Sequence, residues 1–484
     1  MKSSVVSKKI DKRDKTLNET KIAYLPGVRE MKFQVFKSEI VSHISYIVGS
    51  KNKAVVIDPR RDCDIYLETS RKWEAKIDYV FETHRNEDYV IGSAELSKLT
   101  GAQVLHGSGL DWGYGQTISD KQEFSFGSLK IIALHTPGHS PESTSYVLQD
   151  SESGNHPVMV FTGDTLFVGD VGRTDFLGPE MTPVMSEKMY RSIFEKLLPL
   201  GDGVIVFPAH GAGSVCGGKI SEREISTIGI EKKTNPMLQL TKEQFIAAKV
   251  AERHQTPPYF KKMEQYNLHG PPIRGMVANP NPLKPSEFKD KIEKGAYIVD
   301  VRAPVAFGGA HIAGSYSLPS SRLSNAGWVL SYDKPILIVS ENLEAADFAE
   351  KSLYRLGFDN VEGYLANGLE SWYKESLQVA NLSLATVQDL NRMLSSKQDV
   401  FVLDVRRESE WNEGHIAGST RIYLGKLQNE TDKLPRNKPI FVICKTGTRS
   451  SFGASVLLRE AFDQIYNVLG GIDAWKKAAY PLVK

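Results

Sequence analysis

Asp78-Tyr-Val-Phe-Glu-Thr-His84-Arg-Asn86-Glu-Asp88-Tyr89 is the stretch that decides the fold of the first half of this chain. Its apolar run ends in a group of polar side chains. That order is typical of a buried strand that delivers polar groups to a cleft. The stretch has the form of a metal-site motif in which half of the ligands have been exchanged.

Three later apolar runs also end in histidine or aspartate beside glycine or proline. They lead into His135-Thr-Pro-Gly-His139, Thr162-Gly-Asp164 and Pro208-Ala-His210-Gly. A lone histidine at a strand end is usually structural, but four such segments in this order predict a shared site. The short β-rich runs between residues 32 and 207, with helical segments at 63–73 and after Gly92, predict an α/β sandwich with helices on its outer faces.

These segments resemble the metallo-β-lactamase superfamily, whose pattern runs Thr-His-x-His-x-Asp-His, Pro-Gly-His, Gly-Asp and a late Ala-His. The resemblance covers residues 31–253 and implies an αββα sandwich. Within the superfamily the sequence is most similar to persulfide dioxygenases fused to rhodanese modules. Gly163-Asp-Thr-Leu-Phe-Val-Gly-Asp-Val-Gly-Arg-Thr-Asp-Phe176 and Pro208-Ala-His-Gly-Ala-Gly-Ser-Val-Cys216 carry this closer similarity.

The opening motif departs from the superfamily pattern at Asn86 and Tyr89, which stand where the pattern has histidines. A dinuclear hydrolase needs these ligands, and neither an amide nor a neutral phenol replaces imidazole well on a transition metal. His84, His139 and Asp164 remain, and the resemblance implies that they hold a single Fe(II) per chain, with zinc as an alternative occupant in purified protein. Two imidazoles and one carboxylate form a facial triad that suits oxygen chemistry.

Other residues of these motifs are weaker candidates. We expect Asp88 and His210 to lie beside the metal and to orient its ligands rather than to bind it. Arg173 either binds the carboxylate or phosphate of a thiol carrier or forms a salt bridge with Asp175 that fixes the loop. Cys216 either lies near the iron or is inert packing.

Composition bounds the remaining possibilities. At 484 residues the chain should contain two to four domains. Its 60 Lys and Arg nearly balance 58 Asp and Glu, which argues against a nucleic-acid surface. Three separated cysteines favour a reducing, cytoplasmic setting, and the absence of a long apolar run predicts a soluble chain without a membrane span. We expect residues 1–30 to be a flexible extension.

An internal repeat organises the second half. Val299-Asp-Val-Arg302 matches Leu403-Asp-Val-Arg406, and His311-Ile-Ala-Gly-Ser315 matches His415-Ile-Ala-Gly-Ser419, both at an offset of 104 residues (404 minus 300, 415 minus 311). These motifs resemble the rhodanese family. We predict a metallo-β-lactamase-like domain at 31–255, a Pro-rich linker at 256–285, and rhodanese-like domains at 286–380 and 381–484.

The two copies differ where chemistry would occur. The second contains Cys444-Lys445-Thr-Gly447-Thr-Arg449, a strand-to-helix loop that resembles the rhodanese active loop, with Cys444 as the nucleophile. Four residues separate Cys444 from Arg449, whereas a tyrosine phosphatase would have five, so sulfur transfer is favoured. The first copy has Ser340 at the matching position, which predicts a structural or docking module.

The resemblances together predict a two-step sulfur enzyme. The iron domain would oxidise a persulfide of the glutathione or coenzyme A type with dioxygen to sulfite, and Cys444 would pass sulfur from a second persulfide to sulfite, forming thiosulfate. Two alternatives remain open: a thioester hydrolase of the glyoxalase II kind, and a non-catalytic sulfur-binding protein. We expect no nucleic-acid or membrane partner, and a homo-oligomer is compatible with the sequence.

Overall fold

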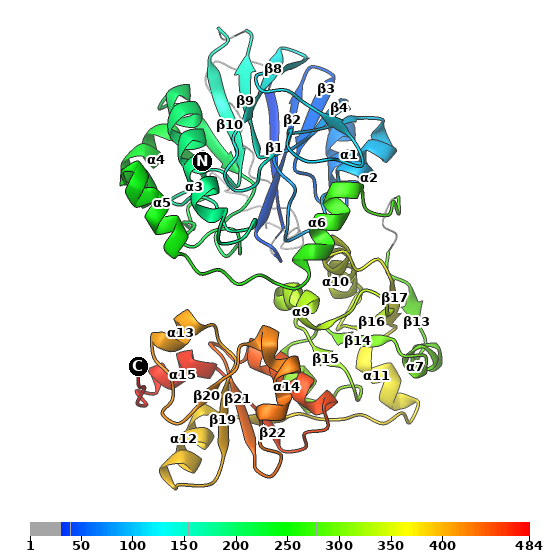
Figure 1. Cartoon of the computed structure of the whole chain (residues 1–484). Helices are drawn as coiled ribbons and strands as arrows, with labels where there is room; N and C mark the ends of the chain where they lie inside the picture. The colour runs from blue at the N-terminus through cyan, green and yellow to red at the C-terminus, as the bar shows by residue number, and fades with distance from the viewer. Residues whose placement is uncertain (1–30, 39, 153, 276–278) are drawn as a thin grey trace, which may run out of the picture. The chain divides into compact units, whose positions relative to one another are not determined.

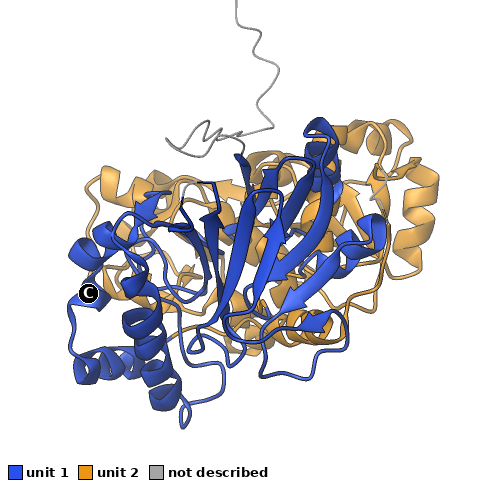
Figure 2. Ribbon diagram, turned by 90° about the horizontal axis from the view of Figure 1, so that it is seen from above, with its two compact units in different colours: residues 1–85, 91–253 blue, residues 86–90, 254–484 orange. Residues whose placement is uncertain are grey.

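The computed structural model of the chain describes residues 31–38, 40–152, 154–275 and 279–484. Contacts divide them into two compact units (Figure 2). The first comprises residues up to 85 and 91–253, and the second comprises 86–90 and 254–484. The predicted extension at 1–30 lies outside the described residues. Within the described ranges, no helix has the length and hydrophobicity that crossing a membrane requires.

The first unit is built on two six-stranded sheets (Figure 1). In both sheets the neighbouring strands follow the order of the chain, which explains why short apolar runs recur so regularly in the sequence. The first sheet contains β1 (Met31–Ser38), β2 (His43–Ser50), β3 (Lys53–Ile57), β4 (Lys76–Glu82), β5 (Gln103–His106) and β6 (Gln116–Thr117). The second contains β7 (Glu123–Phe126), β8 (Leu129–His135), β9 (Thr144–Asp150), β10 (Pro157–Gly163), β11 (Ile205–Pro208) and β12 (Ser226–Thr227).

Alternation along the strands gives each sheet two apolar faces. In β3, Val55 and Ile57 belong to the core shared by both sheets, whereas Ala54 and Val56 belong to a second core on the outer side. Successive side chains of a strand point to opposite faces, so a strand that is buried on both sides reads as a continuous apolar run. This is why Ala54–Ile57 shows no polar alternation.

Helices cover both outer faces. Tyr66 and Leu67 from α1 and Leu96 from α2 pack on the first sheet, and Met189 from α3 and Phe245 from α5 pack on the second. The four layers form the αββα sandwich that was expected. The helices of this unit are α1 (Asp64–Lys72), α2 (Ser93–Thr100), α3 (Thr182–Arg191), which continues as a π-helix at Ser192–Leu197, α4 (Ile228–Thr234) and α5 (Lys242–Ala251).

The second unit contains two parallel five-stranded sheets of identical topology. Their orders are β13-β17-β16-β14-β15 and β18-β22-β21-β19-β20. The first copy consists of β13 (Pro282–Leu283), α7 (Pro285–Glu293), β14 (Tyr297–Asp300), α8 (Pro304–Gly309), β15 (Tyr316–Ser317), α9 (Ala326–Val329), β16 (Ile336–Val339), α10 (Leu343–Arg355), β17 (Val361–Leu365) and α11 (Gly368–Lys374). The second consists of β18 (Ser383–Ala385), α12 (Val387–Ser395), β19 (Phe401–Asp404), α13 (Glu408–Asn412), β20 (Thr420–Arg421), β21 (Ile440–Ile443), α14 (Thr448–Arg459), β22 (Ile465–Val468) and α15 (Gly471–Lys477).

The repeat found in the sequence is a structural repeat. The bounds of β14 and β16 shift by 104 residues (401 minus 297, 440 minus 336) to become the bounds of β19 and β21. In each copy an aspartate at the end of the first of these strands accepts hydrogen bonds from the arginine two residues later, Arg302 or Arg406. The duplicated motif therefore forms the same hydrogen-bonded turn in both copies.

The segment between the two halves contains a helix, α6 (Phe260–His269), within the predicted linker. From this helix the buried Asn267 donates hydrogen bonds to the carbonyl oxygens of Asn86 (2.7 Å) and Tyr89 (2.8 Å). Val90 N–H donates to Arg355 O (2.7 Å). These bonds explain why residues 86–90 group with the second unit. The domain boundaries predicted above remain a prediction.

The aromatic core of the first unit generates a stability prediction. Phe161 is fully buried among Phe33, Tyr46 and Phe207. We expect Phe161→Ala to destabilise the first unit by about 3–5 kcal/mol, because it removes a buried ring and leaves a cavity. Urea unfolding followed by tryptophan fluorescence measures the loss. As a control, Leu177→Ala, at a side chain that is 45% exposed, should change stability by less than about 0.5 kcal/mol. Equal stability of both variants would contradict the assigned core.

Candidate active sites

Four segments at strand ends supply the polar cluster of the first unit. His84 follows β4, His139 lies between β8 and β9, Asp164 follows β10 and His210 follows β11. Two glycines make room for this convergence. Gly163 has a φ of +54°, and a Cβ at that position would lie 2.6 Å from the side chain of Thr83. A Cβ at Gly172 would lie 1.9 Å from the carbonyl oxygen of Asp164.

Asp164 is the centre of the cluster. Its Oδ2 atom lies 3.8 Å from His84 Nε2 and 3.5 Å from His139 Nε2. The two imidazole rings are nearly perpendicular, at 87°, with centroids 4.9 Å apart. All three side chains are buried. The structure thus brings together the three residues predicted to hold the metal, and their atoms form a compact N, N, O group.

The other polar atoms of Asp164 and His139, Oδ1 and Nδ1, each form a hydrogen bond. His210 Nδ1 donates to Asp164 Oδ1 (2.7 Å), and its role in orienting a ligand remains a prediction. His139 Nδ1 donates to the carbonyl oxygen of Arg173 (3.0 Å). A carbonyl can only accept, so His139 carries its proton on Nδ1 and leaves the Nε2 lone pair for a metal.

A longer chain fixes His84. Thr83 Oγ1 donates to Asp58 Oδ2 (2.8 Å) and therefore accepts from His84 Nδ1 (2.9 Å), so the Nε2 lone pair again faces the cluster. Burial lowers the pKa of His84 to about 3, although the charge of Asp164 acts in the opposite direction. Burial acts to raise the pKa of Asp164, but the neighbouring His210 and His84 hold it below its ordinary value. His84 is consequently a neutral imidazole and Asp164 an ionised carboxylate near neutral pH.

This donor set fits a divalent transition metal. Two neutral imidazole nitrogens and one carboxylate oxygen are the ligands of the facial-triad type, and neither histidine needs to lose a proton to bind. The Cys216 sulfur is also close, since its ligand atom and those of His139 and Asp164 lie within 4.8 Å of one another. Cys216 therefore lies beside the candidate ligands, and its role there remains a prediction.

The Arg173 side chain takes the second of its two predicted forms. Its Nε and Nη2 atoms bind Asp175 Oδ1 (2.6 Å) and Oδ2 (2.8 Å), and the side chain is buried. The guanidinium also lies 4.5 Å from the centre of the Phe176 ring, which is nearly perpendicular to the His139 ring at a centroid distance of 5.1 Å. Arg173 therefore braces the loop that supplies the backbone acceptor for His139. Asp88 is buried in the 86–90 segment, and its role beside the metal remains a prediction.

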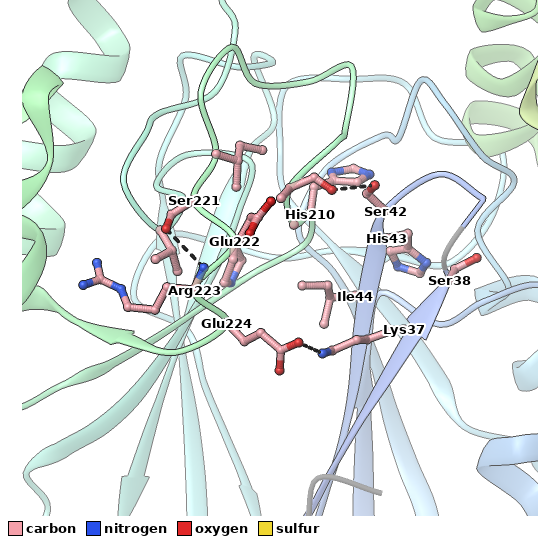
Figure 3. A pocket seen from close by; sticks show the side chains of 15 residues that line it. Lys37, Ser38, Ser42, His43, Ile44, His210, Ser221, Glu222, Arg223 and Glu224 are labelled. Carbon is pink, nitrogen blue, oxygen red and sulfur yellow. Dashed lines mark hydrogen bonds and ion pairs between the residues drawn. The ribbon is translucent and has the colours of Figure 1, made fainter. Parts of the chain in front are cut away.

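A pocket of about 340 Å³ adjoins the cluster, because His210 contributes to its wall. The β1–β2 turn and the loop after β11 form its sides (Figure 3), where Lys37 and Glu224 form an ion pair. Arg223 also lines the pocket and binds the buried Glu231 (3.1 Å). The pocket carries both signs of charge next to the candidate metal ligands.

The second candidate site is the Cys444 loop between β21 and α14. Gly447 N–H donates to Cys444 Sγ (3.1 Å), and the φ of +95° that allows this orientation is readily adopted by glycine. The carbonyl oxygens of Cys444 and Lys445 accept from Ile472 N–H (2.8 Å) and Asp473 N–H (3.0 Å) at the start of α15. The loop carbonyls are thereby bound away from the sulfur, as a thiolate site requires.

Arg449 is held beside this loop by Glu410 of α13, with two hydrogen bonds of 2.7 and 2.6 Å. Burial acts to raise the pKa of Glu410, but Arg449 holds it below its ordinary value. The Lys445 side chain is exposed at the rim. In the first copy, the hydroxyl of Ser340 donates to Asn342 O (2.9 Å), so this copy keeps the fold of the loop without its sulfur.

Three residues of these sites were missed in the sequence. Asp58 follows β3 and precedes a proline, which is the same strand-end pattern that identified the other segments. Thr83 stands inside the quoted motif but was not assigned a role. Glu410 was detectable by comparing the two copies, since the first has Ala306 at the offset of 104 residues (410 minus 306).

Comparisons with known proteins agree with this architecture. The family model described as "Metallo-beta-lactamase superfamily" matches residues 41–210, and "Rhodanese-like domain" matches residues 284–375 and 386–478. "Persulfide dioxygenase ETHE1, mitochondrial" of Bos taurus is 30% identical over 225 residues, covering 44% of this chain and 78% of that protein. "Thiosulfate sulfurtransferase GlpE" of Coxiella burnetii is 34% identical over 83 residues, covering 17% of this chain and 78% of that protein. A crystal structure of a metallo-beta-lactamase from Staphylococcus aureus matches with a TM-score of 0.62 and 28% sequence identity. The match covers 70% of this chain and 99% of the chain in that crystal structure.

The geometry of the Asp164 cluster predicts which histidines retain metal. His139→Ala should lower the metal content of purified protein at least about tenfold, because it removes an imidazole ligand from a three-residue set. His135→Ala is the matched control, since this half-buried histidine binds the carbonyl oxygen of Pro141 instead. Elemental analysis after dialysis reads out both variants. Metal loss in His135→Ala, or retention in His139→Ala, would contradict the assigned ligands.

Proposed function

This chain belongs to the metallo-β-lactamase superfamily, in the family of the persulfide dioxygenases, and carries two rhodanese-like domains; on that premise we propose that it is a persulfide dioxygenase and sulfurtransferase. The first unit oxidises the terminal sulfur of a low-molecular-weight thiol persulfide to sulfite. The second rhodanese-like domain transfers sulfane sulfur through Cys444 to sulfite and forms thiosulfate. Homology to persulfide dioxygenases and the rhodanese domains support a role in sulfur metabolism.

One observation carries the proposal. His84 Nε2 and His139 Nε2 both lie within 3.8 Å of Asp164 Oδ2. The same chain carries one complete cysteine loop. We propose that His84, His139 and Asp164 hold one iron ion. Iron bound there would supply open coordination positions for dioxygen and the substrate sulfur. Asn86 and Tyr89, which stand where the superfamily pattern has histidines, favour one metal over two.

The surrounding residues maintain the protonation states that this reaction needs. His210 occupies Asp164 Oδ1 and leaves Oδ2 for the metal. Thr83 and the carbonyl oxygen of Arg173 hold the Nδ1 protons of His84 and His139, so neither ring has to release a proton when metal binds. Burial of the whole group excludes bulk water from the ligands.

We assign the thiol carrier to the pocket beside His210. The charged residues of its lining, Lys37, Glu222, Arg223 and Glu224, match a substrate that carries both carboxylate and ammonium groups. Such a substrate is of the glutathione type. A coenzyme A persulfide instead presents several phosphates, which the carboxylates of Glu222 and Glu224 in the lining disfavour.

The sulfur balance of the two steps is complete. One persulfide, one dioxygen and one water give the thiol and sulfite. The Cys444 thiolate then attacks the outer sulfur of a second persulfide, releases its thiol and becomes a cysteine persulfide. Sulfite attacks the outer sulfur of that persulfide, which yields thiosulfate and returns the thiolate. The Gly447 N–H stabilises the negative sulfur before and after transfer.

Cys444→Ser separates the two steps. With glutathione persulfide, we expect this variant to consume oxygen at the wild-type rate and to accumulate sulfite, while thiosulfate formation falls at least about a hundredfold because the nucleophilic sulfur is gone. An oxygen electrode and ion chromatography measure the three quantities. His139→Ala should show the reverse pattern, with little oxygen uptake and intact sulfur transfer when sulfite is supplied.

Ser340→Ala is the control for this pair of variants, because it changes the corresponding position of the first copy and should leave both steps unchanged. Unchanged thiosulfate output in Cys444→Ser would end the two-step proposal. Two metals per chain together with hydrolysis of S-lactoylglutathione would replace it with a thioester hydrolase. Absence of bound metal after anaerobic reconstitution with iron would leave a non-catalytic sulfur-binding protein.

A further inference from the structure

We propose that Asn467 is a positioning residue for sulfur transfer, because its side-chain amide directs the hydroxyl proton of Ser450 onto the Cys444 sulfur. The inference rests on the proposed function, since it takes Cys444 as the nucleophile. It adds two groups, neither of which belongs to the Cys444–Arg449 loop itself. Ser450 lies in the first turn of α14, and Asn467 lies on β22, next to β21, the strand that directly precedes Cys444.

The three side chains form a buried line. Ser450 Oγ lies 3.4 Å from Cys444 Sγ and 2.6 Å from Asn467 Oδ1. Ser450 and Asn467 are fully buried, and Cys444 is 1% exposed. A serine hydroxyl has one proton, so it cannot donate to the sulfur and to the amide oxygen at the same time. The direction of that proton decides whether the sulfur is stabilised as a thiolate.

The orientation of the Asn467 amide settles the direction. With Oδ1 toward Ser450, the Nδ2 group has no hydrogen-bond partner among the described residues, which leaves a buried donor unsatisfied. The two ends of an asparagine amide have nearly the same shape and are distinguished by their hydrogen bonds. Turned by 180°, Nδ2 donates to Ser450 Oγ, and an amide oxygen takes the place of the unpaired donor, an exchange that is favourable because buried acceptors are left unpaired more often than buried N–H groups. The hydroxyl then accepts from Asn467 and has its proton available for Cys444.

In this orientation two donors converge on one sulfur. Gly447 N–H approaches at 3.1 Å and the Ser450 hydroxyl at 3.4 Å. Hydrogen bonds to an ionised acceptor are about twice as strong as neutral ones, so both favour the thiolate over the thiol. Asn467 itself does not touch the sulfur and acts through Ser450.

The first copy provides an internal comparison. At the offset of 104 residues, Ser450 corresponds to Ala346 (450 minus 346). The sheet register pairs Val442 with Asn467 in the second copy and Ile338, its counterpart (442 minus 338 is also 104), with Tyr364 in the first. The copy that lacks the cysteine therefore lacks both members of the relay, although the backbone around them is retained.

Alkylation of Cys444 in the full-length protein tests the relay without requiring turnover. We expect Ser450→Ala to slow the reaction with iodoacetamide about tenfold at neutral pH, the effect of one hydrogen bond to a charged group, and to approach the wild-type rate at alkaline pH. Peptide mass spectrometry distinguishes Cys444 from the two other cysteines. Ser450→Thr keeps the hydroxyl and should restore the rate.

The double variant identifies the role of Asn467. Asn467→Leu should slow alkylation severalfold in the wild-type background and have no further effect in the Ser450→Ala background. Asn467→Asp is a second test that preserves the shape of the amide. Its carboxylate only accepts, so it draws the hydroxyl proton away from the sulfur and should slow the reaction at least as much as Asn467→Leu. Ser455→Ala, a buried serine of the same helix that donates to Phe452 O, should match the wild type.

Wild-type alkylation rates in both Asn467 variants, or equal slowing by Asn467→Leu with and without Ser450, would overturn the inference. Transfer of sulfur from thiosulfate to cyanide, measured on the same samples, distinguishes this failure from failure of the proposed function. If the variants alkylate as expected but the wild type transfers no sulfur, the relay stands and the sulfurtransferase assignment falls. If sulfur transfer proceeds and the variants alkylate like the wild type, only the relay falls.

Discussion

The first unit depends on one buried carboxylate whose two oxygens have different tasks. Asp164 Oδ1 accepts a hydrogen bond from His210, and Oδ2 faces His84 and His139. A carboxylate without such partners would be too costly to bury, and three imidazoles without it would have no charge around which to assemble. The glycines at 163 and 172 are consequences of the same arrangement, because any side chain there would push apart the segments that meet at Asp164. The strands bring the histidines close to Asp164, and hydrogen bonds fix which ring nitrogen of each histidine carries the proton.

The second unit shows how one backbone carries a complete cysteine loop in one copy and lacks the cysteine in the other. Both copies close the Asp-x-Arg turn and share strand order. They diverge at Cys444, Arg449 and Glu410, which correspond to Ser340, Ala345 and Ala306. These changes lie in loops and helix starts, where substitution costs the sheet nothing. The first copy retains the residues that form the turn and the sheet, and it lacks the cysteine, the arginine and the glutamate of the second copy.

The sequence predicted what is encoded locally. Strand-end patterns pointed to His84, His139 and Asp164, and the resemblance of one loop to the rhodanese active loop pointed to Cys444, because each of these signals lies within a few residues of chain. What it left open depends on distant partners. The choice between substrate binding and a salt bridge for Arg173 is decided by the burial of its guanidinium, and the pairing of Arg449 with Glu410 spans 39 residues. The presence of α6 within a Pro-rich segment depends on packing that composition does not reveal.

The hydrogen bonds from Asn267 to residues 86–90 limit where the chain can be truncated or fused to another domain. The loop that directly follows a metal-ligand candidate is tied by two hydrogen bonds to a helix some 180 positions later. A polypeptide ending at Arg253 would keep every ligand candidate of the first site and yet leave two loop carbonyls without their donor. The two halves of the chain therefore do not behave as interchangeable cassettes. A gene fusion that replaced the carboxyl-terminal half would have to bring its own equivalent of α6.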